Sequence, residues 1–166
     1  MRAALALFLL LFALAGAAAA QTPPQPPQLP PSEPDKSIAD GSAQRKLDRA
    51  RKRWRRAGIH NYRFELTRQC FCPPGSWVLF VRNDKPVGAP AEARSVATVR
   101  RLHRRIQEAI DDRVSGLGVQ YDKRGMPRFI GIDGREFIAD DEVGYKVEKF
   151  WRGTRGRGGP DRPGEQ

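Results

Sequence analysis

The sequence predicts an α+β fold in two layers, in which two amphipathic helices pack on one face of an antiparallel sheet. Two segments show the helical spacing of apolar residues, and several others show the two-residue alternation of strands. Their order along the chain is helix, strands, helix, strands. Short turns connect neighbouring strands, and strands connected in this way pair antiparallel.

The first helix is expected from about residue 42 to residue 57. Its apolar residues share one face: Ala43, Leu47, Ala50, Trp54 and Ala57. Asp40 or Ser42 could cap its start, and Gly58 stands where a glycine commonly ends a helix. The opposite face is basic, because the segment between Gln44 and Arg56 holds eight Lys or Arg residues and one acid, for a local charge of +7.

A second helix is expected over about Val96–Asp112, where arginines lie on or beside the face opposite the apolar one. Strands are expected at residues 62–67, 77–82, 119–122, 127–133 and 143–150. The second of these strands ends at a turn formed by Asn83-Asp84. Lys123-Arg124-Gly125 has the composition of a hairpin loop.

Length and composition predict one folded domain with additions at both ends. The chain has 166 residues, whereas a domain typically has roughly 100 to 200. Residues 1–20 have the features of a cleaved signal peptide, because Arg2 precedes a short apolar run that ends in small residues. Residues 21–41 are expected to be a Pro-rich linker, residues 42–151 a single α+β domain, and residues 152–166 a disordered tail rich in Gly and Arg.

The expected signal peptide predicts an exported protein that is periplasmic or secreted. An uncleaved N-terminal anchor is the alternative, although a spanning helix needs about 20 apolar residues. No Cys lies near the expected cleavage site after Ala20, so the chain is not expected to be a lipoprotein. The mature chain is also expected to have no transmembrane segment.

Cys70 and Cys72 are a candidate disulfide, since pairing is the default outside the reducing cytosol. The bond would be local and strained, because extended residues two apart lie near the upper separation limit for bridging. A structural clip before Pro73, a redox-active pair, and free or intermolecular thiols all stay open. A closed zinc site needs four ligands, so no metal site is expected. No cofactor is expected either.

Several motifs in the core, taken in order, resemble an uncharacterised family. They are Trp54, Gly58-Ile59-His60-Asn61-Tyr62, Cys70-Phe71-Cys72-Pro73, Tyr121-Asp122 with Gly125 and Pro127, Ile132-Asp133, and Asp140-Asp141-Glu142 with Tyr145 and Phe150. Over about residues 50–150 the chain resembles the bacterial extracytoplasmic domain of unknown function numbered six-one-seven-four. The resemblance implies an exported bacterial protein. Many members look like lipoproteins, and this sequence departs from them by lacking the lipid-acceptor Cys. The family has no assigned activity, so the resemblance supplies no catalytic residue.

Two polar groups have structural explanations. Tyr121, Asp122, Gly125 and Pro127 are a candidate structural turn, because Asp bonds to nearby backbone N–H groups and Gly allows positive φ. An acidic group near the C-terminus could offer oxygen ligands to Ca²⁺, but its spacing does not match the EF-hand loop. Its acids are expected to solvate a loop or to pair with the surplus arginines. This group is Asp133, Glu136, Asp140, Asp141 and Glu142.

The sequence also lacks the common hydrolase, nucleotide-binding and zinc-peptidase motifs, so no enzyme is expected.

The uneven distribution of charge is the main indication of function. The first helix carries +7, whereas Ile132–Phe150 carries −3. Such a cationic face attracts anionic polymers. We therefore expect a small non-enzymatic binding module whose candidate anion-binding residues are Arg49, Lys52, Arg53 and Arg56.

The expected partner is an anionic envelope component: lipopolysaccharide, anionic lipid or an acidic protein. Nucleic acid is not expected as a partner, because the signal peptide predicts export. Two alternatives stay open. The arginines could simply solvate the helix, or the protein could be a periplasmic thiol-disulfide protein that uses Cys70 and Cys72.

Overall fold

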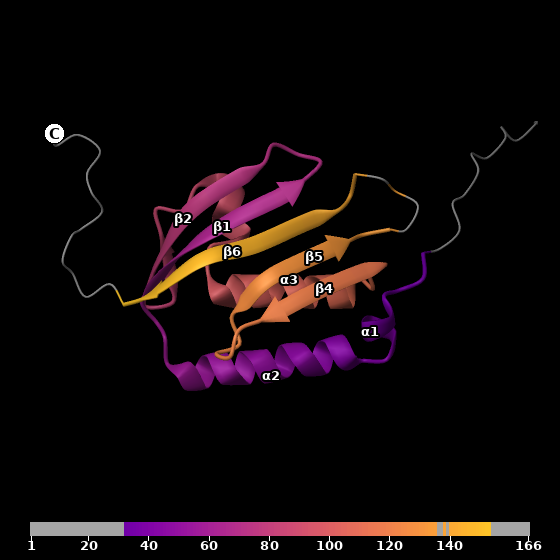
Figure 1. Cartoon of the computed structure of the whole chain (residues 1–166), viewed down its shortest axis with the longest axis horizontal. Helices are drawn as coiled ribbons and strands as arrows, with labels where there is room; N and C mark the ends of the chain where they lie inside the picture. The colour runs from indigo at the N-terminus through magenta and orange to yellow at the C-terminus, as the bar shows by residue number, and fades with distance from the viewer. Residues whose placement is uncertain (1–31, 136–137, 139, 154–166) are drawn as a thin grey trace, which may run out of the picture.

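The computed structural model describes residues 32–135, 138 and 140–153. The expected signal peptide, the expected linker up to residue 31, and the expected tail beyond residue 153 lie outside these residues. Figure 1 shows a sheet with α3 behind it and α2 running beside α3. The elements are α1 (Lys36–Ala39), α2 (Ser42–Ala57), β1 (Tyr62–Cys70), β2 (Gly75–Arg82), β3 (Lys85–Val87), the 3₁₀-helix η1 (Ala91–Val96), α3 (Val99–Asp111), β4 (Gly116–Tyr121), β5 (Pro127–Asp133) and β6 (Val143–Arg152).

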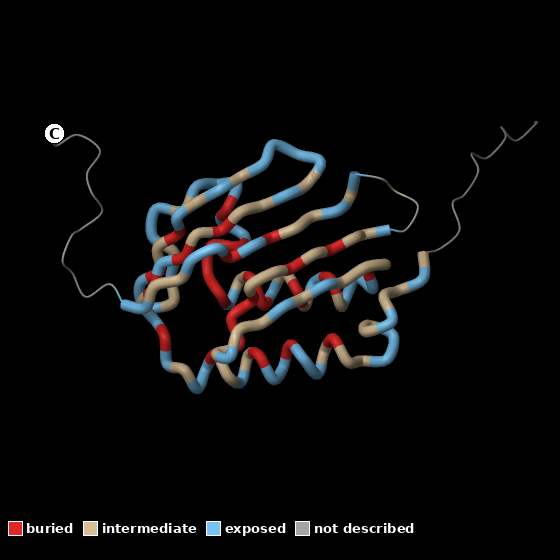
Figure 2. The backbone as a smooth tube through the Cα atoms, in the orientation of Figure 1, coloured by how far each residue is buried: buried red, intermediate tan, exposed pale blue. Residues whose placement is uncertain are grey.

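The sheet confirms the predicted fold class. Its six strands follow the order β3-β2-β1-β6-β5-β4, and every neighbouring pair is antiparallel. The buried residues of α2, α3 and the strands form one hydrophobic cluster, so both helices cover the same face of the sheet. Figure 2 shows buried residues recurring along α2 between exposed ones, as expected for an amphipathic helix.

The centre of this core lies where β1 faces both helices. Tyr62, Phe64 and Leu66 of β1 are fully buried. The ring of Tyr62 meets Trp54 of α2 edge-on at 5.5 Å, and its hydroxyl oxygen accepts a hydrogen bond from the Val99 N–H of α3 at 3.0 Å. The aromatic side chain of one central strand therefore ties the two helices to the sheet.

The start and end of α2 follow from its flanking residues. The N-cap of α2 is Gly41, so neither Asp40 nor Ser42 occupies the capping position that the sequence predicted. The Asp40 carboxylate instead accepts a hydrogen bond from the N–H of Ser42, the first helical residue, at 2.7 Å. Gly58 follows the helix in the left-handed conformation, with φ 58°, and donates its N–H to the Arg55 carbonyl. A glycine takes this conformation without the steric cost of a side chain.

Ordered structure begins before residue 42, within the residues where the sequence predicts a linker. Residues Lys36–Ala39 form α1. Just before it, the Asp35 N–H donates to the Val114 carbonyl at 2.9 Å, and its carboxylate accepts from the Leu117 N–H at 3.2 Å. The proline pattern predicted a linker, but it stops at Pro34, and these long-range hydrogen bonds fix the residues that follow.

The second helix also begins later than its apolar pattern predicts. Residues Ala91–Val96 form η1, and α3 starts at Val99. Thr98 has an extended backbone, and its hydroxyl oxygen accepts from the Arg101 N–H at 3.1 Å. This N-cap separates the two helical segments, because an N-cap residue has a non-helical backbone.

Candidate functional site

Three of the four predicted anion-binding residues lie on the side of α2 that faces away from the core, and the fourth, Arg53, lies at the edge of that side. Arg49, Lys52 and Arg56 are exposed, and Arg53 is half-buried. None of the four forms an ion pair or a side-chain hydrogen bond with another described residue. The Nε atom of Arg53 is buried and also has no partner within the described chain. We call these four residues the outer face of α2.

The acid of α2 does not neutralise this face. Asp48 lies 3.8 Å from the Arg51 guanidinium and accepts a hydrogen bond from Gln44 at 3.0 Å. Gln44 and Arg51 both donate to Gln107 of α3, so Asp48 belongs to the side of α2 that approaches α3. The outer face therefore keeps its positive charge.

A structural role accounts for part of this charge. Arg55 and Arg56 occupy the last turn of α2. Cations there interact favourably with the negative end of the helix dipole. Arg49 and Lys52 lie further from that end, so the dipole does not account for them, because its effect is confined to the last turn.

Sequence reasoning missed a second cationic surface, a cleft between the two helices. Its volume is about 410 Å³, and it is lined by Arg51 and Arg55 from α2 and by Arg100 from α3, among other residues. The two helices run antiparallel here, which brings the end of α2 beside the start of α3. Arg51 lies 56 residues from Gln107, so only the tertiary fold could reveal this arrangement.

The predicted turn at Tyr121, Asp122, Gly125 and Pro127 connects β4 to β5 and lies against α2. The Asp122 carboxylate accepts from the N–H groups of Arg124 and Met126 at 2.8 and 3.0 Å. Gly125 has φ 88°, and a Cβ atom there would overlap the carbonyl oxygen of Ala50. Tyr121 ends β4 and Pro127 begins β5. These contacts pack the turn against α2.

His103 secures the turn from α3. Its side chain is buried, and its Nε2 lies 2.8 Å from the Gly125 carbonyl oxygen. Burial lowers the pKa of His103 to about 4, and the neighbouring Arg51 and Arg55 act in the same direction. The imidazole is therefore neutral at pH 7, and its Nε2–H donates to Gly125.

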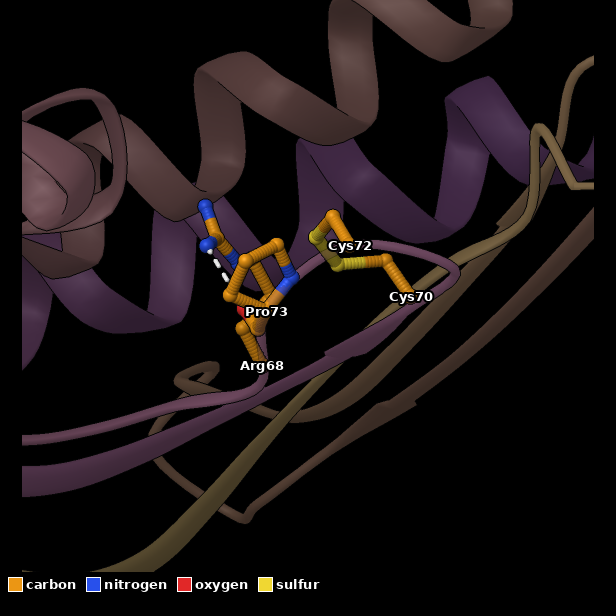
Figure 3. Close-up of a disulfide and its surroundings, with 4 residues drawn as sticks. All are labelled: Arg68, Cys70, Cys72 and Pro73. Atoms are coloured by element: carbon orange, nitrogen blue, oxygen red, sulfur yellow. Dashed lines mark hydrogen bonds between the residues drawn. A yellow bond between two sulfur atoms is a disulfide. The ribbon is translucent and has the colours of Figure 1, made fainter.

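Cys70 and Cys72 are joined as a disulfide at the end of β1, as Figure 3 shows. Their Cα atoms are 5.0 Å apart, well inside the bridging range rather than near its upper limit as the sequence predicted. The chain bends at Phe71 and Cys72, which shortens the separation. Arg68 closes the loop by donating to the Pro73 carbonyl at 3.2 Å.

The acidic group near the C-terminus lies only partly within the described residues, since Glu136 falls outside them. Asp133 accepts a hydrogen bond from the Ser115 hydroxyl at 3.3 Å. Within residues 32–135, 138 and 140–153, no three His, Cys, Asp or Glu side chains gather as metal ligands would. None of the helices in this part of the chain is long and apolar enough to cross a membrane.

These features define a two-layer α+β domain with one cationic helix and a cationic cleft beside it. The comparison with known families identifies it further: the family of unknown function DUF6174 matches residues 46–152. The chain belongs to this family, as its ordered motifs indicated. No curated protein matches the chain, and no solved structure matches it.

The low pKa of His103 predicts that acid destabilises the fold. Between pH 6.5 and about 4 the unfolded chain binds a proton at His103 that the folded chain does not. The free energy of unfolding should therefore fall as the pH falls through this window, by up to about 3 kcal/mol. His103→Gln keeps a donor for Gly125 but does not titrate, so its loss of stability over this window should be smaller. Chemical denaturation at pH 7 and pH 4.5 measures both slopes.

The matched control is His60→Gln, which removes the other histidine, an exposed one. It keeps His103, so the fall in stability that His103 causes should remain in this variant. If His103→Gln also kept that dependence, the buried histidine would not be the group that links folding to pH.

Proposed function

We propose that this chain is a small non-enzymatic binding module of the bacterial cell envelope, which engages an anionic partner through the outer face of α2. One observation carries the proposal: the four cations of this face have no partner within the described chain. Like charges on one helix repel each other. An external anion would relieve that repulsion.

The spacing of the face suits a surface with many anions. Arg49 and Arg56 are two helical turns apart, about 10 Å along the axis. A single exposed ion pair contributes at most about 1 kcal/mol, so useful affinity needs several pairs at once. The phosphates of lipopolysaccharide and of anionic phospholipids provide such an array. Binding of this kind weakens steeply with salt.

The expected location supports an envelope partner. A cleaved signal peptide at residues 1–20 would export the chain to the periplasm or beyond. There it would meet anionic lipid surfaces rather than nucleic acid. A non-enzymatic role is supported by the lack of recognised catalytic motifs in the sequence.

Replacing all four residues of the outer face by Gln should abolish binding to phosphatidylglycerol vesicles at low salt. Gln has a helix propensity close to that of Arg and Lys, so α2 should be retained. With about 1 kcal/mol lost for each cation at an anionic surface, affinity should fall by two to three orders of magnitude, roughly. Co-sedimentation across a salt series measures this.

The control variant removes the same charge from the sheet, by replacing Arg82, Lys85, Lys146 and Lys149 with Gln. These residues lie on β2, β3 and β6. The control should bind nearly as well as the wild type. Equal losses in the two variants would show that only net charge matters. Vesicle binding that survives high salt would show that the contact is not electrostatic. Either result contradicts the proposal.

A thiol-disulfide function is a second candidate, and the exposure of the disulfide loop favours it. Cys72 is exposed, and Phe71 has 83% of its surface exposed. A thiolate of a partner protein could attack Sγ of Cys72, form a mixed disulfide and release Cys70 as a thiolate. A second thiolate of that partner would then displace Cys72, which leaves the partner oxidised and this pair reduced.

This second candidate predicts that Cys70→Ser traps a mixed disulfide through Cys72 in periplasmic extract, visible on a non-reducing gel. Cys72→Ser should trap less, because Cys70 is less exposed. A wild-type disulfide that resists mild reductant would instead indicate a structural clip, because stable structural disulfides have low reduction potentials.

A further inference from the structure

We infer that the cleft between the end of α2 and the start of α3 binds a phosphoryl group as a discrete ligand. This site goes beyond the proposed function, because it is separate from the outer face of α2 and would hold a single group rather than an extended surface. Its walls include Arg51, Trp54, Arg55, His60, Asp84 and Arg100.

The cleft has an excess of positive charge. Three guanidinium groups line it, from two different helices, and Asp84 is its one acidic residue among those described. That carboxylate is already engaged, since its Oδ2 lies 2.7 Å from Nδ1 of His60. Arg55 and Arg100 have no ion pair or side-chain hydrogen bond with any described residue. Their donors are therefore available to a ligand.

One of the three guanidiniums is held in position before any ligand arrives. Arg51 donates to the Gln107 side chain at 2.8 Å and to the His103 carbonyl at 3.4 Å. Gln107 is fixed in turn, because its amide also pairs with that of Gln44, at 2.8 Å. A preorganised donor loses little conformational freedom on binding, which increases affinity.

The chemistry and size of the cleft favour a phosphoryl group. A guanidinium matches phosphate oxygens with two parallel hydrogen bonds. Arg51 adds positive charge to the cleft, although its Nη atoms already contact Gln107, His103 and Asp48. A phosphoryl group has several oxygens to share between Arg55 and Arg100. A carboxylate has only two. The volume of about 410 Å³ is in the range of small-molecule sites. Trp54 and Ile59 add an apolar wall that would cover the organic part of a phosphate ester.

The test uses the three tryptophans as internal reporters in the full mature chain. Trp54 lines the cleft, whereas Trp77 and Trp151 lie on β2 and β6. Inorganic phosphate is titrated at constant ionic strength while ¹⁵N-labelled indole N–H signals are recorded by NMR. The Trp54 signal should shift and saturate, and the other two should stay in place.

Two variants connect the shift to the cleft. Arg55→Gln/Arg100→Gln should weaken phosphate binding at least about tenfold, because each charge-assisted hydrogen bond contributes strongly. Lys46→Gln/Arg104→Gln removes equal charge from exposed positions of the same helices and should bind as the wild type does. If the first variant does not fold, Arg100→Gln alone gives the same comparison.

The outer-face variant separates this inference from the proposed function. It should lose vesicle binding but keep the saturable Trp54 shift. Glycerol phosphate and phosphatidate vesicles then distinguish the source of the group: saturation by the soluble ester indicates a small metabolite, and preference for the vesicles indicates a lipid headgroup. A Trp54 signal that does not saturate, or that shifts equally in Arg55→Gln/Arg100→Gln, overturns the inference.

Discussion

The close approach of the β4–β5 turn to α2 is the contact on which the arrangement of the functional surfaces depends. Gly125 meets the backbone of Ala50 so closely that no side chain fits between them. The neutral imidazole of His103 holds the Gly125 carbonyl from α3, and the Asp122 carboxylate organises the turn itself. Sheet, turn and both helices thus meet at one point.

This contact fixes the rotation of α2 and so decides where its charges face. Ala50 lies under the turn and Trp54 lies in the core. The opposite side of the helix must then face outward, and it carries Arg49, Lys52 and Arg56. The side next to α3 faces the cleft, and it carries Arg51 and Arg55. Both cationic surfaces therefore include a side of α2, and the cleft adds Arg100 of α3. Concentrating like charge in this way destabilises a folded protein, and such local conflicts are expected at functional sites.

Most of the fold could be predicted because its signals are local. The apolar spacing of α2, the stop at Gly58 and the alternation in β1 each lie within a short stretch of sequence. The start of the folded part at Asp35, the division between η1 and α3, and the cleft could not be predicted in this way. Asp35 is fixed by Val114 and Leu117, and the cleft needs Arg100 to come beside Arg55, so each depends on contacts between distant segments.

The most direct test compares the stability of Gly125→Ala with that of Gly88→Ala. Both glycines have positive φ, 88° and 62°, but a Cβ atom at Gly88 would have nothing within 4 Å. Gly88→Ala should therefore cost only the conformational strain of about 1 kcal/mol. Gly125→Ala should reduce the free energy of unfolding by at least about 2 kcal/mol more, because the turn must leave α2. Equal losses in the two variants would contradict the account.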